Sequence, residues 1–229
     1  MKLHIAETFH SFKGEGLYTG TPMFFIRFAG CNVGKKGPAD MTVRRSDDPN
    51  LTIVGTTCTS WDGRKFGCDT DYTRYETLDL EDEAAVQIFM AAIWEKRVVL
   101  TGGEPLQQMG AFHMMMYHLH AAGKIPHIET SGTIWYDFMP SDAWVAVAPK
   151  FGCLGKMLEQ ANEIKLLVDK DFDLKKVPDE CFHHDLVWVC PINPGLDHDW
   201  DNVERCKQLI RQFPKWRLGV QMHKLLHIR

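Results

Sequence analysis

The stretch RVVLTGGEP (97–105) joins a continuously apolar run to a glycine pair, a glutamate and a proline. An unbroken apolar run is typical of a parallel strand that is covered on both faces. Gly102 and Gly103 allow the backbone to approach a ligand closely, and Glu104 can accept hydrogen bonds at the carboxyl end of the strand. A glycine pair after a strand is alternatively a simple structural bend. The segment therefore predicts a parallel strand that ends at a candidate binding turn.

Similar apolar runs recur along the chain, most of them at intervals of about 20–30 residues. They are MFFIRFAG (23–30), PHIETSG (126–132), WVAVAPK (144–150), NEIKLLVD (162–169), LVWVCPI (186–192) and WRLGVQ (216–221). Residues 80–96, 110–122 and 199–213 have helical periodicity, and repeated strand–helix units indicate an α/β fold. A complete eight-stranded barrel typically needs about 250 residues. The 229 residues therefore predict one domain, 1–229, built as an incomplete TIM-type barrel of about six parallel strands.

The composition is that of an ordinary globular protein, with 45% apolar and 24% charged residues and a net charge of −4. This balance excludes a disordered chain and a polycation that coats nucleic acid, so we expect no direct nucleic-acid partner. No apolar run approaches the roughly 20 residues of a membrane span. The first residues, MKLHIAETFHSF, include Lys, His and Glu where a secretory signal needs an apolar stretch. We therefore expect a cytoplasmic protein without a membrane partner.

Three of the seven cysteines, Cys31, Cys58 and Cys68, lie in the first third of the chain. An odd number of cysteines in a chain of this length argues against a disulfide framework. Between Cys31 and Cys58, residues 33–57 interrupt the strand–helix rhythm with Gly, Pro and paired charges, and we expect an inserted loop. Three converging thiolates can hold an iron–sulfur cluster with one iron left open for another molecule. Each cysteine can alternatively be a small buried apolar residue.

Further motifs flank these cysteines in a fixed order. They are FHSFKGEG (9–16), FFIRFAGCN (24–32), CDTDY (68–72), TGGEP (101–105), ETSGT (129–133), APK (148–150) and QMHK (221–224). Together they resemble the radical S-adenosylmethionine enzymes and, within them, the 7-carboxy-7-deazaguanine synthase family, from Phe9 to Arg229. The resemblance implies a [4Fe–4S] cluster, S-adenosylmethionine and Mg²⁺ as cofactors. The implied reaction converts 6-carboxy-5,6,7,8-tetrahydropterin to 7-carboxy-7-deazaguanine with loss of ammonia, as a step of queuosine and 7-deazapurine biosynthesis.

The resemblance also implies the cluster ligands. Cys31 and Cys68 match the first and last ligands of the family. The usual CX2C spacing places the second cysteine at position 65, which is Lys65 in this chain. Cys58 is the only other cysteine of the loop at about 31–68, and we assign it as the second ligand. The expanded loop must then fold back to present Cys58.

The remaining site residues are likewise implied by the family. Thr70 matches the Mg²⁺ ligand. The cofactor contacts correspond to Asp69, Gly103, Glu104, Ser131, Ala148, Pro149, Lys150, Cys190 and Asn193. The pterin pocket corresponds to Phe12, Lys13, Gly14, Glu15, Arg27, Thr101, Glu129, His223 and Arg229. In this assignment the Arg27 guanidinium binds a carboxylate bidentately, and Glu129 accepts hydrogen bonds from the aminopyrimidinone edge of the pterin.

The chain departs from the family pattern at four pocket positions. The usual Gln of the GEG motif is Lys13, a further Gln is Cys190, the Thr of the QTHK-like segment is Met222, and the terminal Pro is Arg229. None of these changes removes a cluster ligand. Lys13 and Arg229 add charge beside the expected substrate.

The partners that we expect are the pterin substrate, a second copy of the chain, and an electron donor such as a flavodoxin. The homodimer follows partly from the resemblance and partly from the sheet edge that an incomplete barrel leaves. Two other functions stay open on the sequence alone. One is a different radical S-adenosylmethionine enzyme, such as an activase of a glycyl-radical protein. The other is a non-catalytic iron–sulfur or zinc protein.

Overall fold

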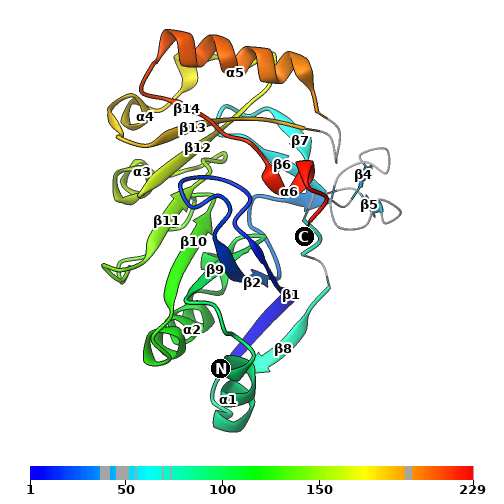
Figure 1. The fold of residues 1–229 in the computed structure, drawn as a ribbon, viewed down its shortest axis with the longest axis vertical. Helices are drawn as coiled ribbons and strands as arrows, with labels where there is room; N and C mark the ends of the chain where they lie inside the picture. The colour runs from blue at the N-terminus through cyan, green and yellow to red at the C-terminus, as the bar shows by residue number, and fades with distance from the viewer. Residues whose placement is uncertain are drawn as a thin grey trace.

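A curved nine-stranded sheet in the order β14-β13-β12-β11-β10-β9-β2-β1-β8 forms the framework of the computed structural model (Figure 1). The structure describes residues 1–36, 42–44, 52–54, 56–68, 70–72, 74–193 and 198–228. Strands β1 and β8 pair antiparallel, and the other seven pair in parallel. The predicted α/β partial barrel of about six parallel strands is confirmed: seven parallel strands are present, the last of which, β14, has only two residues.

Every apolar run singled out in the sequence forms a parallel strand. These strands are β2 (Pro22–Phe28), β9 (Arg97–Gly102), β10 (Ile125–Thr130), β11 (Trp144–Val147), β12 (Glu163–Val168), β13 (Val187–Pro191) and β14 (Arg217–Leu218). In β9, Val98, Val99 and Leu100 are completely buried, as expected for a strand covered on both faces. The antiparallel strands β1 (Lys2–Phe12) and β8 (Glu76–Asp79) were not predicted.

Helices cover the convex side of the sheet (Figure 1). They are α1 (Glu83–Ala91), α2 (Met109–Ala121), α3 (Gly155–Gln160), α4 (Asp179–His183) and α5 (Trp200–Gln212), with the short 3-10 helices η1 (Pro105–Gln108) and η2 (Leu174–Lys176). Asp82 and Asp199 start α1 and α5 by accepting hydrogen bonds from first-turn amides. The three predicted helices are thus present. None of the helices in the described ranges is long and apolar enough to cross a membrane.

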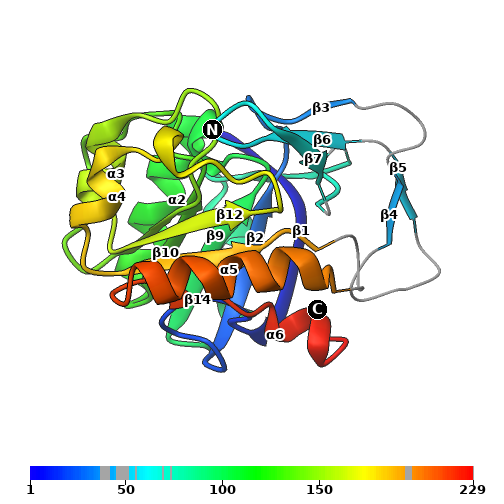
Figure 2. The same ribbon diagram turned by 90° about the horizontal axis from the view of Figure 1, so that it is seen from above.

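The predicted insertion contains short strands. They are β3 (Lys35–Lys36), β4 (Thr42–Arg44), β5 (Thr52–Val54), β6 (Thr56–Thr59) and β7 (Lys65–Gly67). Strands β3, β6 and β7 form one small sheet, and β4 and β5 form a hairpin that projects away from the barrel (Figure 2). The chain therefore leaves the barrel at β3, returns at β6 and turns back along β7.

The hairpin of β6 and β7 is attached to the open side of the barrel. Ser60 forms a β-bridge with Lys150 at the end of β11, and the amide of Phe151 donates to the carbonyl of Thr59 at 3.2 Å. The indole of Trp61 donates to the carbonyl of Lys176 at 2.7 Å. These contacts hold the insertion above the carboxyl ends of β11 and β12, where sites form in barrels.

Candidate active site

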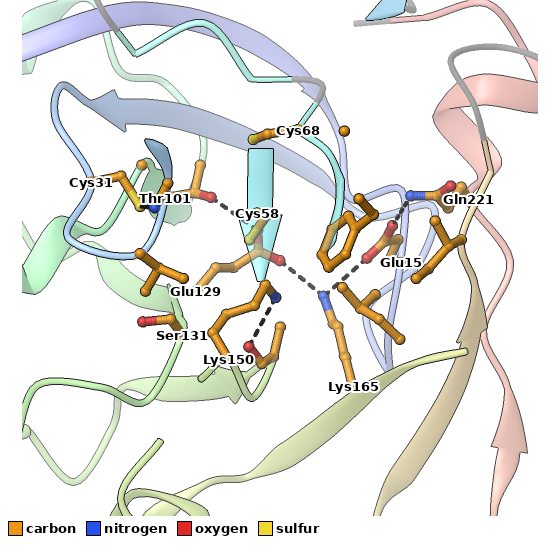
Figure 3. A pocket seen from close by; sticks show the side chains of 18 of the residues that line it. Glu15, Cys31, Cys58, Cys68, Thr101, Glu129, Ser131, Lys150, Lys165 and Gln221 are labelled. Carbon is orange, nitrogen blue, oxygen red and sulfur yellow. Dashed lines mark hydrogen bonds and ion pairs between the residues drawn. The ribbon is translucent and has the colours of Figure 1, made fainter. Parts of the chain in front are cut away.

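A cavity of about 540 Å³ lies between the carboxyl ends of the parallel strands and the inserted hairpin. It contains side chains from β9 to β13, from the hairpin and from the C-terminal segment (Figure 3). Eight of the residues predicted for the cluster and cofactor line it: Cys31, Cys58, Cys68, Gly103, Ser131, Ala148, Lys150 and Asn193. Residues from distant parts of the chain thus meet at one site.

The insertion brings the three predicted cluster cysteines to this cavity. Cys31 follows β2, Cys58 lies on β6 opposite Phe66, and Cys68 directly follows β7. Because β3 starts four residues after Cys31 and pairs with β6, the small sheet connects all three positions. Burial raises the pKa of the Cys31 thiol, although the Gly34 amide donates to its Sγ at 3.2 Å and opposes the shift. Among the described residues, no three His, Cys, Asp or Glu side chains are close enough to hold a single metal ion.

The two glycines of the TGGEP turn permit a close contact with the segment that leads to Cys31. A side chain at Gly102 would collide with the Phe28 carbonyl, and one at Gly103 with the Gly30 carbonyl. Gly102 also has a φ of 125°, which only glycine adopts readily. The Gly103 amide donates to the Phe28 carbonyl at 3.1 Å, and the Glu104 amide to the Gly30 carbonyl at 3.0 Å. The turn therefore positions the loop of the first predicted cluster ligand.

Glu104 is completely buried, and its carboxylate serves the protein itself. It accepts hydrogen bonds from the Leu106 amide at 3.2 Å, the Thr130 hydroxyl at 2.8 Å, and the Ser131 amide and hydroxyl at 2.8 and 2.5 Å. These bonds tie the end of β10 to the turn. Glu104 is absent from the lining of the cavity, as are Pro149 and Cys190. Cys190 lies beneath Gly219, where an added side chain would meet its sulfur.

A second cavity of about 200 Å³ contains most of the predicted pterin pocket. It is lined by Phe12, Lys13, Gly14, Glu15, Arg27, Thr101, Glu129 and His223, together with Thr70, the predicted Mg²⁺ ligand. The two cavities share Glu15, Thr101, Glu129 and Gln221 as a common wall. The predicted cofactor and substrate sites are therefore neighbours. Asp69 and Arg229 lie outside the described residues.

Arg27 is held at the wall of the second cavity by protein partners. Its Nε lies 2.8 Å from Glu7 Oε1, and its Nη1 donates to the Thr70 hydroxyl at 3.2 Å. The guanidinium also lies over the ring of Phe9, 5.4 Å from its centroid. These contacts orient the planar group and place it beside Thr70.

A buried network of charges crosses the common wall (Figure 3). Glu129 pairs with Lys13 and with Lys165, whose Nζ is 2.9 Å from Oε1. Lys165 also lies 3.5 Å from Glu15, and Gln221 donates to Glu15 at 2.7 Å. Burial alone would raise the pKa of Glu129, but the two lysines hold it well below its usual value. Burial opposes the charge of Lys165, yet Glu129 and Glu15 raise its pKa well above the usual value.

Lys165 and Gln221 are site residues that we did not predict. Lys165 lies within the run NEIKLLVD, which predicts an apolar strand. Its neighbours Ile164 and Leu166 are completely buried, whereas Glu163, Lys165 and Leu167 lie on the other face of β12, and Lys165 and Leu167 line the first cavity. The sequence did contain a signal for this site: Glu163 and Lys165 are charged residues two positions apart in an otherwise apolar strand, so both point to the same face.

The four remaining cysteines are separate from the site's thiols. Cys181 and Cys206 are completely buried, and burial raises the pKa of Cys153, Cys181 and Cys206 to about 12. Burial also raises the pKa of Cys190 well above its usual value. All seven cysteines are free thiols. The four therefore act as small apolar residues, the alternative considered for each cysteine from the sequence.

A partial parallel barrel with three thiols and the TGGEP turn at one cavity is the architecture of a radical S-adenosylmethionine enzyme. The chain is 30% identical over 237 residues to a 7-carboxy-7-deazaguanine synthase from Bordetella pertussis and 31% identical over 244 residues to one from Burkholderia multivorans. Both alignments cover 100% of each chain. The crystal structure of QueE from Escherichia coli matches with a TM-score of 0.61 and 27% identity, covering 96% of this chain and 94% of that one. The chain belongs to the 7-carboxy-7-deazaguanine synthase family, as its motifs predicted. No protein-family model matches it.

Proposed function

We propose that the protein converts 6-carboxy-5,6,7,8-tetrahydropterin to 7-carboxy-7-deazaguanine with loss of ammonia, in 7-deazapurine biosynthesis. Its family is one of radical S-adenosylmethionine lyases that use a [4Fe–4S] cluster. The observation that carries the proposal is the pair of adjoining cavities. One contains three thiols, and the other contains a guanidinium and a carboxylate suited to a carboxypterin. An activase of a protein radical has no need for the second, small-molecule cavity.

The donor set of the first cavity fits the cluster and its cofactor. Three thiolates would bind three irons and leave the fourth open to an amino acid group. When bound, the cluster and S-adenosylmethionine supply the one-electron chemistry that removes a hydrogen atom from the substrate. Ser131, Lys150 and Asn193 provide polar groups for the cofactor around the same cavity. Glu104 does not line the cavity and acts through Ser131, because its carboxylate accepts hydrogen bonds from the Ser131 amide and hydroxyl.

In the second cavity the protein's part is to bind and orient the pterin. Arg27 would hold the substrate carboxylate, and Glu129 would accept hydrogen bonds from the aminopyrimidinone edge. The network around Glu129 favours its charged form, which is the form that accepts these bonds. The shared wall then fixes the substrate beside the cofactor, and such placement is a large part of what an enzyme contributes.

An anaerobic assay tests this function. Reconstituted protein with dithionite, S-adenosylmethionine and the tetrahydropterin should release 7-carboxy-7-deazaguanine, identified by mass spectrometry. Single Ala variants of Cys31, Cys58 and Cys68 should lose the iron–sulfur absorbance, whereas Cys206→Ala should retain it. A full [4Fe–4S] cluster in Cys58→Ala would refute the assignment of the second ligand. Uncoupled cofactor cleavage without product would point to a different substrate.

We also propose that Thr70 binds Mg²⁺ together with the substrate carboxylate. Magnesium prefers oxygen ligands and keeps several waters, so one hydroxyl suffices when a substrate supplies another oxygen. The position of Thr70 beside Arg27 in the second cavity supports this role. Thr70→Ala should raise the Mg²⁺ concentration needed for half-maximal turnover and leave the cluster intact. An unchanged Mg²⁺ requirement would refute the role.

The remaining partners are proposals of the same kind. A homodimer is supported by the sheet edges at β8 and β14, and sedimentation equilibrium tests it. A flavodoxin-type donor would reduce the cluster, and replacing dithionite with reduced flavodoxin tests that. The seven free thiols are consistent with a reducing compartment such as the cytoplasm.

A further inference from the structure

Lys13 is a buried lysine in the second cavity, at the position where the family usually has Gln. Only 4% of it is exposed. Its backbone is fixed, since its amide donates to the Thr21 carbonyl and its carbonyl accepts from the Gly20 amide, both at 2.8 Å. Its ammonium pairs with Glu129 Oε1. Because burial lowers the pKa of Lys13, its charge depends on a close acceptor.

The hydrogen bonds already made by Glu129 limit what it can offer a ligand. Oε1 accepts from Lys13 and Lys165, and Oε2 accepts from the Thr101 hydroxyl at 3.1 Å. A carboxylate oxygen has two lone pairs. Oε1 is therefore fully used, and Oε2 has one lone pair left. Glu129 can accept two hydrogen bonds from a ligand only if one donor leaves Oε1.

The aminopyrimidinone edge of a pterin presents three groups side by side: the C4 carbonyl, the N3–H and the 2-amino group. The two N–H donors need two acceptors, and the carbonyl needs a donor. If N3–H bonds to Oε1, the C4 carbonyl comes to lie next to that oxygen. The Lys13 ammonium that leaves Oε1 can then reach the C4 carbonyl oxygen, its new acceptor, by a short movement.

We propose that Lys13 determines specificity for a 4-oxo pterin by passing from Glu129 to the C4 carbonyl oxygen when the substrate binds. This inference rests on the proposed function. Lys165 stays on Oε1 and keeps Glu129 charged during the exchange. A ligand without an acceptor at C4 leaves a buried ammonium unpaired and is therefore rejected.

The test uses 6-carboxypterin, the oxidised and unreactive analogue, with the reconstituted enzyme and S-adenosylmethionine. Its dissociation constant is measured by pterin fluorescence, and its C4=O stretch by infrared difference spectroscopy with ¹⁸O at C4. Lys13→Met should weaken binding by about 10–100-fold, the value of a hydrogen bond to a charged group. It should also shift the C4=O stretch of the bound ligand to higher frequency. Lys13→Gln retains a neutral hydrogen-bond donor, so its dissociation constant and its C4=O frequency should both lie between those of the wild type and Lys13→Met.

Lys207→Met, on the exposed side of α5, removes the same charge far from the cavity and should change neither quantity. An identical C4=O stretch in the wild type and Lys13→Met would overturn the proposal, whatever the change in affinity, since a merely structural lysine would weaken binding without touching the carbonyl. Wild-type enzyme that does not bind 6-carboxypterin would remove the proposed pterin substrate and this inference together. If the wild type binds 6-carboxypterin but its C4=O stretch is the same as in Lys13→Met, the proposed pterin substrate stands and only the role of Lys13 is refuted.

Discussion

Arg27 shows how single side chains in the second cavity are prepared for a ligand. Glu7 and Thr70 each hold one part of the guanidinium, so its remaining donors have a fixed direction. Arg27→Ala should weaken binding of 6-carboxypterin by about a hundredfold or more, because the substrate carboxylate would lose a bidentate partner. Arg27→Lys should restore little, since an ammonium cannot reproduce the planar pair of donors. Uncoupled cofactor cleavage should persist; if it is lost as well, Arg27 serves the fold or the cofactor.

Lys165 gives a prediction of pH dependence. Glu129 must be ionised for both of its oxygens to act purely as acceptors, and in the wild type its pKa lies well below the usual value because of the two lysines. Without Lys165 one of the two charges that lower the pKa of Glu129 is lost, and that pKa would rise. The acidic limb of 6-carboxypterin binding should therefore move to higher pH in Lys165→Met, by about 1 unit or more. A binding curve that loses affinity equally at every pH would show that Lys165 only fills space.

At the scale of elements, the turn between β6 and β7 presents the thiols. Arg64 ion-pairs with Asp169 beyond β12, donates to the Leu167 carbonyl at 3.3 Å and lies over the rings of Trp61 and Phe172 at 5.5 and 5.6 Å. Within the turn it pairs with Asp62 at 2.6 Å. Arg64 thus adds to the contacts of Ser60, Thr59 and Trp61 that attach the hairpin of Cys58 to the barrel.

Arg64→Met should leave the barrel folded but loosen this hairpin. We expect a chelator to remove iron from the reconstituted variant about tenfold faster, because a charged hydrogen bond is lost at the turn. Lys65→Met, an exposed neighbour on β7, is the matched control and should release iron at the wild-type rate. Equal rates in all three proteins would mean that other contacts hold the hairpin.

The elements that could be predicted from the sequence are those with a local signal. Apolar runs such as RVVL identify parallel strands because burial on both faces leaves no polar position. Strand β1 was missed because its residues alternate between buried and exposed, and it pairs antiparallel with β2. The position of Cys58 could not follow from spacing, since its hairpin is held by residues far away in the chain, among them Asp169, which is 105 residues from Arg64.

The site shows the same limit. Most residues named from the motifs line one of the two cavities, but Glu104, Pro149 and Cys190 do not, and Lys165 and Gln221 were not predicted. Glu104 was predicted as a cofactor contact, and the structure adds that its carboxylate accepts four hydrogen bonds from Leu106, Thr130 and Ser131, which no local pattern reveals. Gly16 needs its φ of 79°, and a side chain there would collide with Glu163. Glu163 in turn accepts from the Leu17 amide at 2.9 Å, a partner that no local pattern reveals.

On the scale of the whole molecule, the two ends of the chain close the second cavity. Helix α6 (Met222–Leu225) begins where the Met222 amide donates to the Gly14 carbonyl at 2.9 Å. Removing residues 221–229 should abolish 6-carboxypterin binding and leave the iron–sulfur cluster intact, because the three cysteines lie outside the removed segment. The paired Ser variants of Leu225 and Leu226, both exposed, should bind normally. A truncated protein that binds within about threefold of the wild type would show that the segment is dispensable.

The bond between Gln221 and Glu15 joins residues 206 positions apart. Glu15 is translated before the first parallel strand of the sheet, and Gln221 after the last one. Contacts between residues so far apart in the sequence form late in folding, because the entropy cost of closing the long loop between them must first be offset by the rest of the sheet. A nascent chain can therefore assemble the hairpin of Cys58 and Cys68 long before it can accept a pterin. The pterin pocket is thus completed only once Gln221 has been made, after the elements that carry Cys31, Cys58 and Cys68.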